Sequence, residues 1–183
     1  MAFLSKKELN KLNFKHLGEN VLISDKCSIY NPSNISIGDN TRIDDFCILS
    51  AGDGGIEIGR YVHISCFASI LGKGKVTMKD YSGISSRVTV FSSSDVYDGE
   101  WMTNPTIPSH LTNVKHKDVV IGKHVVVGAH TVILPGVILE DGCSVGALSL
   151  VTKSSNGRFI YSGIPAKKLK PRKDNIFNLE KEL

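Results

Sequence analysis

An aliphatic residue recurs at every sixth position over the second half of the chain, and this spacing restricts the possible folds more than any other feature. The positions are Ile121, Val127, Ile133, Leu139, Val145 and Val151. A period of six matches neither the 3.6 of an α-helix nor the simple alternation of a surface strand. It is typical of a solenoid in which each hexapeptide forms one short strand and one corner.

Earlier parts of the chain carry the same spacing in shorter blocks separated by slips of phase. The blocks are Leu17, Ile23, Ile29, Ile35; Ile37, Ile43; Ile58, Ile64, Ile70, Val76; and Met78, Ile84, Val90. Three hexapeptides make a triangular coil of about 18 residues, and stacked coils bury their aliphatic side chains as one continuous core. We therefore predict an all-β solenoid, a parallel β-helix forming one domain over residues 1–183.

Three segments lack the repeat. Ser5 and Glu8 form a capping box, which predicts a short N-terminal helix covering the first coil. Residues 92–118 have no six-fold pattern and are predicted to be a loop extruded from the solenoid, and such long loops are usually functional. Helical spacing of apolar residues after Pro171 predicts a C-terminal helix at about 173–183.

Composition excludes several classes of protein. Of 183 residues, 41% are hydrophobic and 22% are charged, which is ordinary for a globular domain. The apolar runs are far shorter than a membrane span, and the N-terminus lacks the pattern of a signal peptide, so we expect a cytoplasmic protein. The cysteines lack metal-site or redox spacing and are predicted to be small core residues, with a nucleophilic cysteine as the alternative: Cys27, Cys47, Cys66 and Cys143.

Positive charge gathers at the C-terminal end. The net charge is +4, and from Lys153 onward eight Lys or Arg face three Asp or Glu. Interleaved aromatic residues and a nucleic-acid motif are missing, so we predict no nucleic-acid partner. A phosphate-bearing small molecule is the narrower interpretation, and a solvated basic tail is the alternative. His124 and His130 are predicted to lie on the surface, and no metal site is predicted.

With these features the sequence resembles the hexapeptide-repeat acyltransferases of the left-handed β-helix type, in the galactoside and maltose acetyltransferase branch. The match covers nearly the whole chain and is best at 127–137, 145–153 and 162–166. Loop residues 94–105 are most similar to members that acetylate amino-dideoxy sugars on dTDP, the dTDP-4-amino-4,6-dideoxyglucose N-acetyltransferases. The left-handed twist is implied by this resemblance alone, because parallel crossovers are ordinarily right-handed.

The resemblance implies that acetyl-CoA lies in a groove between neighbouring subunits of a homotrimer, near the C-terminal coils. Matching positions that would bind it are Gly128, Ala129, Ala147, Thr152, Lys153 and Lys170. The small residues would give the pantetheine arm access to the backbone, and the lysines would pair with phosphates. Tight packing at a solenoid corner is an alternative reason for the two alanines.

A departure from the galactoside branch bears on mechanism. Asp95 stands where that branch has a loop histidine as general base. A carboxylate is a weak base for a sugar hydroxyl, whereas an amine with a pKa of about 8 is partly neutral at pH 7 and attacks a thioester directly. Asp95 therefore favours N-acetylation. Two alternatives stay open: Asp95 could be a turn former, and His63 could be the base.

The resemblance also suggests residues for the acceptor, a dTDP-linked amino sugar. They are Ser65, Tyr97, Trp101 and Asn104. Trp101 would cover a base or sugar ring, or anchor the loop on the solenoid. The predicted function is an acetyl-CoA-dependent N-acetyltransferase for surface polysaccharide such as the O-antigen of lipopolysaccharide. The alternatives are O-acetylation of a sugar hydroxyl and a non-enzymatic structural solenoid.

Overall fold

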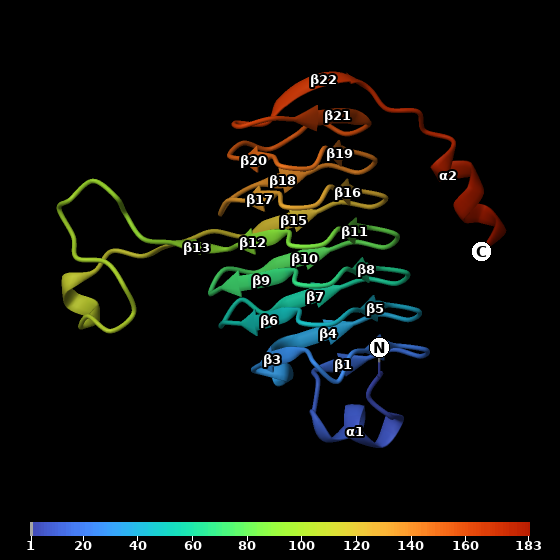
Figure 1. Cartoon of the computed structure of the whole chain (residues 1–183), viewed down its shortest axis with the longest axis horizontal. Coiled ribbons are helices and arrows are strands. Elements are labelled where there is room, and N and C mark those ends of the chain that lie inside the picture. Colours follow the sequence, from blue (N-terminus) through green and yellow to red (C-terminus); the bar gives the residue numbers. More distant parts are fainter. Residues whose placement is uncertain (1) are drawn as a thin grey trace.

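The computed structural model describes residues 2–183 and shows a chain wound into a parallel β-solenoid with three faces (Figure 1). Face one stacks six strands in parallel: β1 (His16–Leu17), β4 (Ile35–Ile37), β7 (Ile56–Ile58), β10 (Val76–Met78), β15 (Val119–Ile121) and β18 (Ile138–Leu139). Each strand pairs with the strand one coil earlier and one coil later, so hydrogen bonds run along the solenoid axis.

Face two is the sheet with the most strands. Its strands are β2 (Leu22–Ile23), β5 (Arg42–Ile43), β8 (His63–Ile64), β11 (Gly83–Ile84), β16 (Val126–Val127), β19 (Ser144–Val145), β21 (Phe159–Ser162) and β22 (Lys167–Pro171). The last two pair antiparallel and form a hairpin at the C-terminal end of the solenoid. The hairpin was not predicted, because its residues do not follow the six-residue period.

Face three completes the triangle. Its strands are β3 (Ser28–Tyr30), β6 (Ile48–Ala51), β9 (Ser69–Gly72), β12 (Thr89–Phe91), β17 (Val132–Ile133) and β20 (Leu150–Val151). In each coil the chain runs from face one to face two to face three. We call the turns joining faces two and three corner 2/3, and those joining face three to face one corner 3/1.

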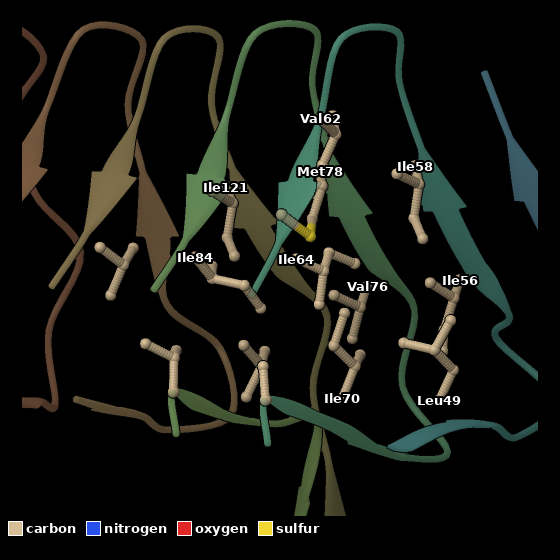
Figure 2. Close-up of a cluster of buried hydrophobic side chains, with 14 of the residues drawn as sticks. Leu49, Ile56, Ile58, Val62, Ile64, Ile70, Val76, Met78, Ile84 and Ile121 are labelled. Atoms are coloured by element: carbon tan, nitrogen blue, oxygen red, sulfur yellow. The ribbon is translucent and has the colours of Figure 1, made fainter. Parts of the chain in front are cut away.

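The predicted aliphatic positions form the core. All six repeat residues from Ile121 to Val151 are at most 3% exposed. Ile64, Ile84 and Met78 point from different strands into the interior of the solenoid, which Figure 2 shows for the middle coils. Burial of this one stack of branched side chains stabilises every coil against its neighbours. The prediction of a hexapeptide solenoid is confirmed.

Both ends of the solenoid are covered. Helix α1 (Lys6–Lys11) begins with the predicted capping box, in which the Ser5 amide donates to the Glu8 carboxylate at 2.8 Å. The β21–β22 hairpin lies at the other end, and beyond it only α2 (Ile176–Leu179) and the 3₁₀ turn η3 (Glu180–Glu182) are helical. Both lie beside the solenoid, as Figure 1 shows for α2. The predicted helix at 173–183 is therefore present but shorter, because side chains on either side of it bind the solenoid corner.

One long segment leaves the solenoid between β12 and β15 and projects sideways (Figure 1). The antiparallel strands β13 (Ser93–Ser94) and β14 (Lys115–His116) form its stem, and η2 (Ser109–Leu111) lies in its outer part. A further 3₁₀ turn, η1 (Pro32–Asn34), precedes β4. None of the described helices is long and apolar enough to cross a membrane.

Candidate functional site

The predicted site residues lie at two different corners of the solenoid. Corner 2/3 and the strand end before it hold His63, Ser65, Gly128, Ala129 and Ala147. Corner 3/1 and its loop hold Asp95, Tyr97, Trp101, Asn104, Thr152 and Lys153. Lys170 lies in β22 at the C-terminal end. Face three separates the two groups, so the predicted site residues do not come together within one chain.

A groove of about 310 Å³ lies at corner 2/3. Its lining consists of His63, Ser65, Gly83, Ile84, Ser85, Ser86, Val126 and Ala129. The Ser65 and Ser86 hydroxyl oxygens lie 3.0 Å apart and link successive coils. Ser85 and Ser86 were missed in the sequence, although Ser85 follows a buried isoleucine as Ser65 does, which is a signal that aligning the coils would have revealed.

His63 is held in place by a buried acid. Its Nε2 lies 2.8 Å from Asp44 Oδ2, and Arg42 Nε donates to the other Asp44 oxygen at 2.7 Å. Burial acts to raise the pKa of Asp44, but hydrogen bonds from Arg42 and His63 outweigh it, so this pKa lies below its ordinary value. The imidazole itself is half exposed to the groove, an arrangement suited to proton transfer.

Neighbouring coils touch backbone to backbone beside this groove. A Cβ placed on Gly128 would lie 2.3 Å from the Ala147 amide nitrogen. Ala147 and the next residue, Leu148, are exposed at the adjacent rung of the corner. Small residues here leave the polar backbone open to an elongated ligand, and they are also demanded by the close stacking of the coils. Both reasons given for the alanines are therefore compatible with the structure.

A larger cleft of about 790 Å³ lies at corner 3/1, between the extruded loop and the solenoid. The lining residues are Lys73, Phe91, Ser93, Ser94, Asp95, Tyr97, Asn104, Pro105, Ile107, Ser109, Thr112, Val114, Leu134 and Pro135. Asp95 and Tyr97 thus share one cavity, and Tyr97 is 87% exposed. Trp101 does not line the cleft and is partly exposed on the loop.

Asn104 has a local structural role in this loop. Its Oδ1 accepts hydrogen bonds from the Thr106 amide at 2.9 Å and the Thr106 hydroxyl at 2.6 Å. This is an Asx turn, which fixes the backbone where Asn104 has a φ of 83°. The amide oxygen is therefore committed to the loop, and only the amide nitrogen of this side chain is open to a ligand.

The loop is fastened at its stem. The Lys73 amide donates to Ser93 Oγ at 2.7 Å, and that oxygen lies 2.7 Å from His116 Nδ1. Beyond the stem several large apolar side chains are exposed: Tyr97, Trp101, Met102, Leu111 and Val114. A projecting loop with this much exposed apolar surface is typical of a segment that packs against another molecule.

The basic end of the chain forms an exposed edge. Every residue of β22 is exposed, and the Lys168 ammonium lies 3.3 Å from the centroid of the Phe159 ring. Thr152 and Lys153, which directly follow β20, are also exposed. This end of the solenoid therefore offers several cations to a phosphate group.

The prediction that the cysteines are core residues is confirmed for two of the four, because Cys27 and Cys66 are only partly buried. Cys47 and Cys143 are buried, and burial raises the pKa of the Cys143 thiol. A hydrogen bond with Cys27, followed by burial, raises the pKa of Cys47. Neither thiol is set up as a nucleophile. No group of three or more potential metal ligands occurs within residues 2–183.

The prediction that His124 lies on the surface is wrong. Its ring is only 10% exposed, stacks on Tyr81 at 5.0 Å between centroids, and meets Phe177 edge-on. Its Nε2 lies 2.6 Å from Glu180. The C-terminal turn covers this histidine, which the local sequence around His124 does not reveal. His130 is exposed, as predicted.

Comparison with known proteins agrees with the fold. The family model for the bacterial transferase hexapeptide (six repeats) matches residues 118–153. A dTDP-4-amino-4,6-dideoxy-D-glucose acyltransferase of Escherichia coli is 50% identical over 98% of this chain and 94% of its own length.

Two solved structures of AntD, an N-acyltransferase from Bacillus cereus, are 45% identical to this chain. One, with dTDP and 3-hydroxybutyryl-CoA, superposes with a TM-score of 0.93 over 98% of this chain and 95% of AntD. The other is a serine-to-alanine mutant with dTDP-4-amino-4,6-dideoxyglucose and coenzyme A, with a TM-score of 0.95 over 99% and 96%.

The hexapeptide solenoid and these similarities together show the class of protein. The chain belongs to the hexapeptide-repeat acyltransferases, and its solenoid is the left-handed β-helix of that family. Within the family it is similar over nearly its full length to the acyltransferases that are named for dTDP-linked amino sugars.

Proposed function

We propose that this protein transfers the acetyl group of acetyl-CoA to the amino group of a dTDP-linked 4-amino-4,6-dideoxyglucose. The observation that carries the proposal is the 50% identity, over nearly the whole of both chains, to the acyltransferase named for that sugar. The AntD structures support the same pair of ligands, an acyl-CoA and a dTDP-sugar. The product would serve surface polysaccharide synthesis in the cytoplasm, where acyl-CoA is made.

The groove at corner 2/3 and the cleft at corner 3/1 support a shared active site. In one chain the groove with His63 and Ala129 and the cleft with Asp95 lie at different corners. A homotrimer of parallel solenoids would place the loop of one copy over the groove of the next, and the exposed apolar side chains of the loop would be buried there. We propose this trimer as the working form of the enzyme.

The reaction needs one proton acceptor. The neutral sugar nitrogen attacks the thioester carbonyl carbon, the carbon–sulfur bond breaks, and coenzyme A leaves as its thiol. The nitrogen of the tetrahedral intermediate is an acidic ammonium, so the Asp95 carboxylate is basic enough to take its proton and pass it toward the sulfur. In this proposal Ala129 and Ala147 line the coenzyme groove, and Lys153 and Lys170 bind its phosphates.

One observation favours a second candidate, O-acylation of a sugar hydroxyl. His63 and Asp44 form an oriented pair at the groove, and in Ser-His-Asp enzymes a histidine oriented by an acid in this way removes the proton of a hydroxyl. Under that alternative His63 removes the hydroxyl proton and Asp44 stabilises the imidazolium. Under the main proposal the same pair contributes to positioning the acceptor, together with Ser65.

The two candidates separate in a thiol-release assay with acetyl-CoA. The acceptors are dTDP-4-amino-4,6-dideoxyglucose and the matched dTDP-sugar with a hydroxyl at the same carbon. The proposal predicts thiol release with the amine alone and an amide in the product by mass spectrometry. Release with the hydroxyl sugar alone would overturn it in favour of His63-dependent O-acylation.

A further inference from the structure

One arginine at corner 2/3 stands beside the groove in a fixed orientation. Arg87 directly follows Ser86, which lines the groove. Its guanidinium carbon lies 4.6 Å from the centroid of the Phe67 ring one coil away, and Phe67 stacks on Phe46 at 4.9 Å. Stacking of a planar guanidinium on an aromatic face limits its motion while leaving its N–H edge exposed.

Two other cations at or near this corner, Arg42 in β5 and Lys26, are already paired with acids. Arg42 binds Asp44 at 2.7 Å, and Lys26 lies 3.4 Å from Asp45. In the described part of the chain, Arg87 has neither an ion pair nor a side-chain hydrogen bond. Its five N–H donors are therefore open to a ligand. The Phe67 ring holds the guanidinium in one place, which an arginine that only interacts with solvent does not need.

The proposed acceptor needs a cation near this place. A dTDP-sugar carries a diphosphate directly next to the sugar, and the groove lining contains neither lysine nor arginine. The basic C-terminal end is assigned to the coenzyme and lies on later coils. Arg87 is on the same coil as Ser85 and Ser86, so a sugar held in the groove would bring its diphosphate within reach.

We propose that Arg87 binds the diphosphate of the nucleotide-sugar acceptor and that Phe67 positions its guanidinium. The inference rests on the proposed function and names a binding residue that discriminates nucleotide sugars from free sugars. Arg87 is suited to this role because a guanidinium binds two phosphate oxygens at once. Phe67 acts only through Arg87, by keeping the Arg87 guanidinium directed along the corner.

The test measures Arg87→Gln and Phe67→Leu, with Arg60→Gln as the matched control, since Arg60 is an exposed arginine paired with Asp80 at another corner. We expect Arg87→Gln to raise KM for dTDP-4-amino-4,6-dideoxyglucose about 10- to 100-fold, with kcat and KM for acetyl-CoA unchanged. Calorimetric binding of dTDP should weaken by the same factor. Phe67→Leu should raise the same KM by a smaller factor. Phe67→Tyr keeps the aromatic ring and should leave the KM at the wild-type value.

Each other outcome has a definite meaning. Unchanged KM and dTDP affinity in Arg87→Gln would overturn the inference, and a rise confined to the KM for acetyl-CoA would reassign Arg87 to the coenzyme. A smaller oligomer by light scattering would instead place Arg87 in a contact between copies. The proposed function fails separately, if the wild-type protein acylates no amino sugar, and dTDP binding still tests Arg87 in that case.

Discussion

At the scale of single residues, contact between coils limits the size of the side chains that corner 2/3 can hold. Gly128 has no room for a side chain, because a Cβ would overlap the backbone of Ala147 at 2.3 Å. Gly83 lies in β11, just before the same corner, and a Cβ there would make an ordinary contact of 3.5 Å with the His63 carbonyl oxygen. The two glycines therefore differ in what they contribute to stability.

Gly128→Ala should destabilise the fold by about 1–3 kcal/mol, because backbone atoms of two coils must move apart to admit the methyl group. Gly83→Ala is the control and should change the free energy of unfolding by less than about 1 kcal/mol. Urea unfolding followed by circular dichroism at one protein concentration measures both. Equal effects of the two substitutions would contradict the packing described at Gly128.

Residue identities alone could predict some of the site and not the rest. Asp95 was found because its position in the loop differs from a family pattern, and the structure places it with Tyr97 in one cavity. Ser86 was not found, since its relevance comes from a neighbour one coil away. The partnership of His63 with Asp44 was missed for the same reason, because the two are 19 positions apart in the chain.

At the scale of elements, the C-terminal turn is held on the solenoid by charge. Glu180 in η3 binds Lys123 at 2.8 Å and His124 at 2.6 Å. Arg172, which directly follows β22, donates to the His124 carbonyl oxygen at 2.7 Å. The hydrogen bond from Lys123, and then that from His124, lowers the pKa of Glu180.

This lowered pKa predicts a pH-dependent attachment. Because the folded state favours the ionised carboxylate, its contribution is complete above the ordinary value of 4.5 and is lost as the pH falls through the lowered pKa. Glu180→Gln should therefore reduce hydrogen-exchange protection of residues 176–182 at pH 7, and the difference from wild type should disappear in acid.

The matched control is Glu182→Gln, an exposed residue of the same turn that has no side-chain partner within residues 2–183. It should leave protection unchanged at both pH values. A loss of protection in Glu180→Gln that persists at low pH would show that the carboxylate charge is not what holds the turn.

Elements were predictable where one period repeats and unpredictable where it stops. The aliphatic stack from Ile121 to Val151 fixed the strands of the later coils, since burial selects one face of each hexapeptide. The β21–β22 hairpin and the short α2 follow no period. Their positions depend on contacts such as Arg172 to the carbonyl oxygens of His124 and Cys143, which link distant parts of the chain.

At the scale of the whole molecule, the main feature is that the predicted catalytic residues of one chain, His63 and Asp95, lie in two separate cavities. Corner 2/3 offers a groove with a histidine, serines and close backbone, and corner 3/1 offers a loop with a carboxylate in a mostly apolar cleft. In the proposed trimer, a closed ring of three copies would complete three equal sites by one repeated contact. The central claim is that acyl transfer occurs where the loop of one copy covers the groove of the next.

Mixed oligomers test this claim most directly. Asp95→Asn should lower turnover about 100-fold through loss of the proton acceptor, and Ala129→Trp should block the groove, while Asp98→Asn serves as the loop control and stays active. Trimers formed from equal amounts of the two inactive chains should recover about a quarter of wild-type activity, because one contact in four joins an intact loop to an intact groove. If these mixed trimers form but stay inactive, while wild-type trimers are active, the site lies within one chain and the account is wrong.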